Sequence, residues 1–331
     1  MAHNQDDEVP QQYKYAWDYD APTMPLQDFL NKYKPSMVQN DGTKPWIWVE
    51  SRRPHKSTSV EKEILAMAEA SEVLQEVTKK VESADDSIPI RSNKKTGAKS
   101  KKEVREQLQS EATDKFKAIA QRYGYVNGKW LIFASQDKVD MIWSSLAKSL
   151  IEGPLAATDA YTTKVSTSPE TDTPNFLHVI CLYIPDVYDK ESITEVMKVL
   201  LRHHGSTLSG VKSDLYTRLG IDSKHASGIQ STIWKNSALL KDTEAKALKD
   251  EFFKELQAAP KATDPPTTQA TDDAAATAAK PKPKLVKKKK GNDDPFASDE
   301  DEDEPPAPKN KKRSKGDEDE DEPPKKKRGK K

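Results

Sequence analysis

The last part of this chain contains almost no residues that could build a hydrophobic core. Between Pro260 and Lys331 there is no Trp, Tyr, Ile or Met, and the only large apolar residues are Leu285, Val286 and Phe296. Such a segment cannot bury enough apolar surface to offset the conformational entropy lost when its backbone is ordered. We therefore expect residues 259–331 to form a disordered, charge-blocked tail, and any folded domain to precede it.

The charges of this tail are arranged in blocks. The octet DEDEDEPP occurs at 299–306 and again at 317–324, and a basic cluster follows each copy, first at 309–313 and then at 325–331. A dense basic run preceded by Pro is typical of a nuclear import sequence, although a polyelectrolyte tail without a targeting role is the alternative. The import run consists of Lys325, Lys326, Lys327 and Arg328.

The tail also predicts a location and a modification. Its basic run implies that an import carrier is a partner. We therefore expect the protein in the nucleus, either only there or in both the nucleus and the cytoplasm. Ser298 is followed by three acidic residues and is a candidate site for an acidophilic kinase, whose phosphate would deepen a negative block.

The region before the tail has the composition of one folded domain. It contains all six Trp residues of the 331-residue chain. We expect a flexible arm at 1–12 and one domain at 13–258, with a mobile insertion at about 83–101. Cys181 has no second cysteine for a disulfide, which indicates a reducing compartment. No apolar run approaches the length of a membrane span, so we expect a soluble protein with no membrane partner.

Apolar periodicity predicts a mixed order of strands and helices. Short runs of β-forming residues predict strands, and apolar residues spaced by three and four predict helices, which together indicate an α+β fold. Trp130 and Trp143 fit these periodicities as core residues. The expected strands are 45–51, 128–135, 159–167 and 175–184, and the expected helices are 58–81, 102–123, 137–151, a helix capped by Ser192, and 243–258.

Signatures of catalysis are weak. The chain has no GxSxG elbow, and its single Cys181 lies in the apolar run FLHVICLYI, a poor place for a nucleophile. His203 and His204 are the only close histidine pair. Adjacent residues on a helix point about 100° apart and cannot easily chelate one ion. We expect a non-enzymatic protein with no cofactor and no metal site.

Several segments resemble a known family. GKWLIF (128–133), then TTKVST, HVICLYIPD and finally LYTRLGI (215–221) resemble segments of the cap-binding translation initiation factor 4E in the same order. The closer similarity is to the basophilic leukaemia expressed protein family, a branch of the same 4E-like superfamily, over roughly residues 45–240. The resemblance implies a curved antiparallel sheet with long helices on one face.

The binding residues depart from the cap-binding pattern. In the cap-binding factor two Trp from separate loops sandwich a methylated guanine, whereas here the loop after the first strand reads SRRPHKSTS. We therefore do not expect cap recognition. Positive charge persists, and the resemblance implies that Lys164 lies near a phosphate-contacting position. The candidate residues for RNA or a nucleotide-like ligand are Trp46, Trp48, Arg52, Arg53, His55, Lys56 and Lys164.

Each candidate has a second interpretation. Trp46 and Trp48 share parity on one strand, so they project from one face, either as core beneath the helices or as a stacking surface. The basic residues are either solvated surface charge or a phosphate-binding patch. Two functions remain open: a module that binds RNA or a nucleotide-like ligand through a basic concave face, and a protein-interaction scaffold with a nuclear-targeted tail.

Overall fold

The computed structural model describes residues 13–52, 58–87, 89, 91–92, 99–171 and 173–258. The expected arm, part of the expected insertion and the tail lie outside these residues. The described elements include, in chain order, β1 (Ala16–Asp18), α1 (Leu26–Lys32), β2 (Trp46–Glu50), α2 (Val60–Ser87), α3 (Lys101–Tyr123), β3 (Gly128–Ser135), α4 (Val139–Glu152), the 3-10 turn η2 (Pro154–Ala157), β4 (Thr162–Ser166), β5 (Leu177–Ile184), α5 (Lys190–His204), β6 (Leu208–Ser213), α6 (Asp214–Arg218), α7 (Asn236–Leu239) and α8 (Asp242–Ala258).

The strands form one mixed sheet of six, in the order β1-β2-β4-β5-β3-β6. All neighbours pair antiparallel except β1 and β2, which are parallel. A parallel pair needs a crossover between its strands, and the segment that contains α1 supplies it. The expected α+β class and the largely antiparallel sheet are confirmed.

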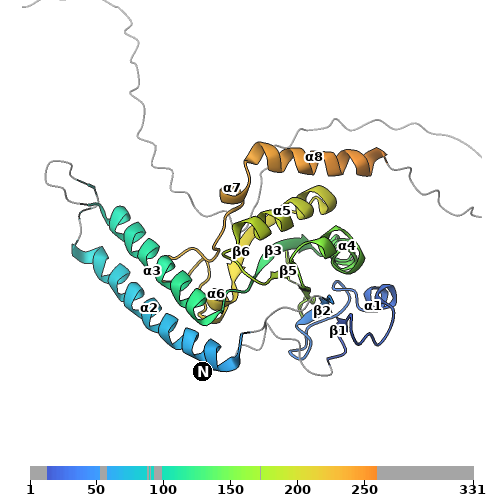
Figure 1. Cartoon of the computed structure of the whole chain (residues 1–331), viewed down its shortest axis with the longest axis horizontal. Helices are drawn as coiled ribbons and strands as arrows, with labels where there is room; N and C mark the ends of the chain where they lie inside the picture. The colour runs from blue at the N-terminus through green and yellow to red at the C-terminus, as the bar shows by residue number, and fades with distance from the viewer. Residues whose placement is uncertain are drawn as a thin grey trace, which may run out of the picture. The chain divides into compact units, whose positions relative to one another are not determined.

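One face of the sheet packs against helices. Alternate residues of the strands point to this face, where they meet α1, α4 and α5 in the main hydrophobic core (Figure 1). Trp130 and Trp143 are buried in it, as their periodicity predicts. Its other large members include Phe29, Ile47, Val49, Ile132, Leu146, Leu150, Val165, Ile180, Leu182, Ile184, Val196 and Leu200.

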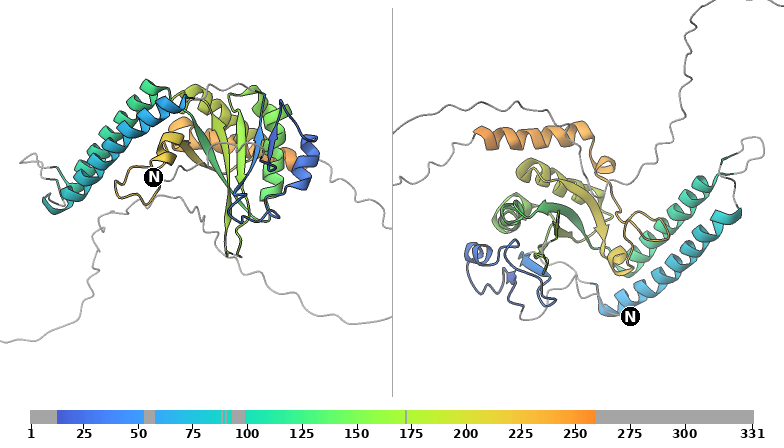
Figure 2. Two further views of the ribbon diagram at one scale, coloured as in Figure 1. Left: turned by 90° about the horizontal axis from the view of Figure 1, so that it is seen from below. Right: turned by 180° about the vertical axis from the view of Figure 1, so that it is seen from behind.

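The two longest helices, α2 and α3, lie side by side as a hairpin (Figure 2). Their shared core includes Phe116 and extends to Tyr216 on α6, so the hairpin is anchored beyond the β6 end of the sheet. A capping box at Ser100 begins α3, and Gly124 ends it in the left-handed conformation. Helix α2 continues to Ser87, beyond the expected end at 81.

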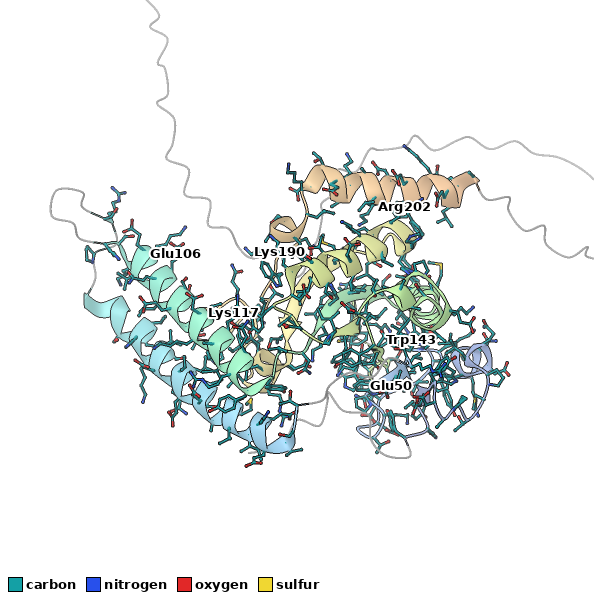
Figure 3. All side chains as sticks on the ribbon, in the orientation of Figure 1. Glu50, Glu106, Lys117, Trp143, Lys190 and Arg202 are labelled. Atoms are coloured by element: carbon teal, nitrogen blue, oxygen red, sulfur yellow. The ribbon has the colours of Figure 1, made fainter. Side chains whose placement is uncertain are left out.

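Helix α5 begins earlier than the sequence predicts. Its N-cap is Asp189, whose carboxylate accepts from the backbone N–H groups of Glu191 and Ser192. The predicted cap, Ser192, is already inside the helix, and its hydroxyl donates to Asp159 at 2.7 Å. Arg202, near the end of α5, pairs with Glu251 and Glu255 of α8, which lies along α5 (Figure 3).

Within the described ranges, no helix combines the length and the apolar character that a membrane span requires.

Candidate functional site: a cationic and aromatic sheet face

Trp46 and Trp48 lie on the sheet face opposite the helix-packed core. Their neighbours across the strands are Ser166 and Lys164 on β4, and Lys164 in turn lies beside Cys181 on β5. The prediction that the two Trp share a face is confirmed. The alternative prediction, that these two Trp pack in the core beneath the helices, is wrong. The residues that alternate with them, Ile47 and Val49, lie in that core instead.

We call six residues of this second face the sheet-face cluster. They come from four neighbouring strands, and their side chains meet because directly opposed residues in an antiparallel sheet point to the same side. The sheet-face cluster consists of Trp46, Trp48, Lys129, Lys164, Cys181 and Tyr183.

Lys164 occupies the centre of the sheet-face cluster. Its Nζ lies 4.1 Å from the ring centroid of Trp46, 4.7 Å from that of Trp48 and 5.5 Å from that of Tyr183. The electron-rich faces of aromatic rings attract a cation at such distances. The side chain is 1% exposed, so the alternative interpretation of Lys164 as a solvated surface charge is wrong.

A second buried lysine, Lys129 on β3, was not among the predicted site residues. Its Nζ lies 3.0 Å from Oδ1 of Asp214, at the start of α6, and 5.1 Å from the ring centroid of Tyr183. Asn127 donates a side-chain hydrogen bond to the same carboxylate. The signal was present in the sequence, since Lys129 alternates with the core residue Trp130 and must face the other side of β3.

The rings of the sheet-face cluster are closely packed. Trp48 stacks on Tyr183 with a centroid separation of 5.9 Å and an interplanar angle of 24°. Both side chains are only 2% exposed. Among the described residues, none accepts a hydrogen bond from the buried Nε1 of Trp46. The site therefore offers an indole N–H donor beside the ammonium group of Lys164.

Acidic residues border the β1 end of this face. Glu50 closes β2 opposite Asp18 of β1. Burial raises the pKa of the Glu50 carboxyl above its usual range, and the nearby carboxylates of Asp18 and Asp20 add to this effect. The face is thus polarised, with carboxylates at one end and the ammonium groups of Lys129 and Lys164 toward the middle.

Arg52, another predicted site residue, does not belong to the sheet-face cluster. Arg52 is exposed, and its guanidinium lies 5.9 Å from the ring centroid of Tyr19. Several predicted residues lie outside the described residues: Arg53, His55, Lys56, Ser298, Lys325, Lys326, Lys327 and Arg328.

A serine–histidine pair elsewhere has a different geometry from a catalytic triad. His204 Nε2 lies 2.9 Å from the hydroxyl of the buried Ser149, and its Nδ1 lies 3.0 Å from the hydroxyl of Ser145. In a triad the second nitrogen is oriented by a carboxylate instead. The described part of the chain contains no group of three His, Cys, Asp or Glu residues placed to hold a metal ion.

These features define a class of protein: a mixed α/β domain whose sheet carries helices on one face and a cationic, aromatic cluster on the other. A family model described as basophilic leukemia-expressed protein Bles03 matches residues 2–220. The chain belongs to this family, as the resemblance of its strand segments implied. The matched region contains the whole sheet-face cluster, whereas α7 and α8 follow it.

Proposed function

We propose that this chain is a non-enzymatic binding protein that takes RNA or a nucleotide-like ligand on the sheet-face cluster. The observation that carries the proposal is the placement of the Lys164 ammonium against the rings of Trp46, Trp48 and Tyr183. Aromatic rings stack on bases, and ammonium groups pair with phosphate oxygens. The 4E-like resemblance supports the same face, because it sets a phosphate-contacting basic residue near Lys164.

The burial of the cluster determines how such a ligand could enter. Trp48, Lys164 and Tyr183 present almost no surface to solvent, so a ligand must displace whatever covers them. A base of the ligand would then stack on the rings of Trp48 and Tyr183 in place of the atoms that pack against them. Without a second Trp loop for a sandwich, the proposed ligand class is RNA or nucleotide in general, and recognition of a methylated cap is not part of the proposal.

The test is a titration of the full chain with single-stranded oligoribonucleotide, capped and uncapped, and with a free cap analogue. Lys164→Met retains an apolar stem of similar length but removes the ammonium. We expect it to weaken oligonucleotide binding about 10–100-fold, since a hydrogen bond to a charged group is worth about 1.5–3 kcal/mol. Intrinsic tryptophan fluorescence at low and high salt gives the dissociation constants.

Lys117→Met is the matched control, because Lys117 also lies over an aromatic ring, 5.5 Å from the centroid of Tyr188, but belongs to α3 (Figure 3). It should leave the affinity within twofold. Equal losses in both variants would contradict the assignment to the sheet face. If no oligonucleotide binds even at low salt, the second candidate function, a protein-interaction scaffold, is favoured. Helix α2 exposes the apolar side chains of Val60, Ile64 and Leu65, which a protein partner could contact.

We also propose that the protein accumulates in the nucleus through Lys325–Arg328. The basic run and its polar surroundings in the sequence support this. Pairing with the acidic octets should not block a carrier, because exposed ion pairs are worth only about 0–1 kcal/mol and are screened over roughly 8 Å. A fluorescent fusion with these four residues changed to Ala is expected to become mainly cytoplasmic.

The control for this prediction changes the same number of basic residues, four, in the folded domain. Lys62, Lys79, Lys80 and Lys102 are exposed on α2 and α3, and their change to Ala should leave the fusion nuclear. The import proposal fails if the fusion stays nuclear after 325–328 and the upstream cluster 309–313 are both neutralised.

A further inference from the structure

We propose that helix α8 is a displaceable cover, and that the surface of α5 beneath it is a docking site for an acidic amphipathic helix of a partner protein. Helix α8 packs along α5 (Figure 1). Helix α5 covers the helix-packed face of the sheet. The proposed docking site is therefore separate from the sheet-face cluster and does not depend on the proposed ligand.

Arg202, in the last turn of α5, holds α8 through two carboxylates. Its Nε lies 3.0 Å from Oε2 of Glu251, and its Nη1 lies 2.9 Å from Oε2 of Glu255. Because the two glutamates are four residues apart, they lie on one face of α8. A guanidinium presents its N–H groups in a planar fork that suits carboxylate oxygens. Arg202 therefore favours a helix that carries two carboxylates at this spacing.

A glycine near Arg202 leaves room for an aromatic ring. Gly205 ends α5 in the left-handed conformation, with a φ of 54°. A Cβ atom at this position would lie 2.5 Å from the ring of Phe252, which is much closer than the optimal separation of two carbon atoms. The ring therefore lies directly against the backbone at the end of α5.

The residues of α8 that face the domain form one helical stripe. Ala245 and Leu248 pack against the main hydrophobic core, and Glu251, Phe252 and Glu255 continue the stripe toward the end of the helix. The pattern from Leu248 onward is an apolar residue at i, Glu at i+3, an aromatic residue at i+4 and Glu at i+7. These positions share one face of a helix, the arrangement with which amphipathic helices dock in grooves. The bound α8 thus specifies the chemistry of a partner helix that could replace it.

Helix α8 is only loosely attached to the domain. None of its 17 residues is buried, whereas α5 buries five residues. The side chains of Glu251 and Glu255 are more than half exposed, and exposed ion pairs contribute little to stability. Segments with few buried contacts open locally without global unfolding. We therefore expect α8 to leave α5 while the rest of the domain stays folded.

The test measures how tightly the full chain binds a second copy of the α8 helix, supplied as a peptide. The probe is a fluorescein-labelled peptide of residues 242–258, and its fluorescence anisotropy reports binding. In the unchanged chain the tethered α8 competes at an effective concentration on the order of millimolar, so the peptide should bind weakly. The variant E251K/E255K places two cations against Arg202 and deletes no core side chain. We expect it to bind the peptide about tenfold or more tighter than the unchanged chain does.

Matched variants assign the effect to the surface of α5. E106K/D250K makes the same change of charge at two exposed residues that form no ion pair with Arg202 (Figure 3 labels Glu106). It should leave the peptide affinity within about twofold of the unchanged chain. Adding R202Q to E251K/E255K should remove most of the gain, because the peptide carboxylates then lose their cation.

Hydrogen exchange of the unchanged chain gives an independent measurement that needs no variant. The backbone amides of α8 should exchange about 100-fold or more faster than those of α5, because local opening releases α8 alone. Equal protection of the two helices would show that α8 is an integral part of the fold, and it would overturn the proposal.

The binding experiment has two further outcomes against the proposal. Equal peptide affinities of E251K/E255K and the unchanged chain would overturn the docking site. Dimerisation of the unchanged chain that E251K/E255K abolishes would assign the surface of α5 to α8 of a second copy instead of a partner protein. Neither result changes oligonucleotide binding, so this proposal and the proposed function can fail separately.

Discussion

Lys129→Met is expected to lower the free energy of unfolding by about 3–5 kcal/mol, the cost of breaking a buried ion pair by removing one partner. Lys129 and Asp214 are both buried, with their charged atoms 3.0 Å apart. Without the ammonium, the Asp214 carboxylate remains buried with the amide of Asn127 as a polar neighbour. Urea or guanidinium denaturation followed by tryptophan fluorescence measures the change.

The double variant Lys129→Met/Asp214→Asn distinguishes the ion pair from simple loss of packing. Because both charges are then removed together, we expect it to recover at least 1 kcal/mol relative to the sum of the two single variants, which is the coupling that a double-mutant cycle detects for residues in contact. Strict additivity of the three free-energy changes would show that the pair does not stabilise this side of the sheet.

Acidification is expected to destabilise the fold through His204. Burial between Ser145 and Ser149 lowers the pKa of the imidazole to about 4 from its usual 6.5, and the neighbouring His203 adds to the shift. The unfolded chain therefore binds the proton more readily, and stability falls as the pH drops from 6.5 toward 4. For these two pKa values, the expected loss between pH 7.5 and pH 5 is about 2 kcal/mol.

The measurement is the free energy of unfolding at both pH values for the unchanged chain, His204→Gln and His203→Gln. The His204 variant should lose less stability on acidification by about 2 kcal/mol. The variant of the exposed His203, which contributes only the smaller part of the pKa shift, should lose nearly as much stability as the unchanged chain. His178, whose pKa burial also lowers, is present in all three proteins and cancels in the comparison. Parallel pH profiles for all three would refute the assignment to His204.

Local sequence patterns predicted most elements of this fold. The strand at 128–135 has the predicted bounds, and α3 begins and ends within one residue of the prediction. These elements were predictable because their signals are local: a left-handed Gly124 stop, an alternating strand and an apolar helical stripe. The prediction of family membership likewise came from short contiguous segments.

Elements without a strong local pattern were missed. The three-residue strand β1 is defined by its pairing with β2. The polar strand β6 pairs with β3, and the register of this pairing shifts near Gly210, whose φ is 132°. Asp189 caps α5, and the hydroxyl of Ser192, the predicted cap, instead donates to Asp159. In each instance the deciding contact comes from a residue outside the element itself.

The sheet-face cluster shows most clearly the difference between what local sequence predicts and what contacts distant in the sequence decide. Alternation along β2 and β3 places Trp48 and Lys129 opposite the core, and this much follows from the side-chain period of a strand. That Lys164 is buried does not follow, because lysine is almost never fully buried unless it is paired. Its burial is acceptable only where register places Trp48 on one side of it and β5, with Tyr183, on the other. Those partners are distant in the sequence, so only tertiary pairing could decide that this charge lies among aromatic rings.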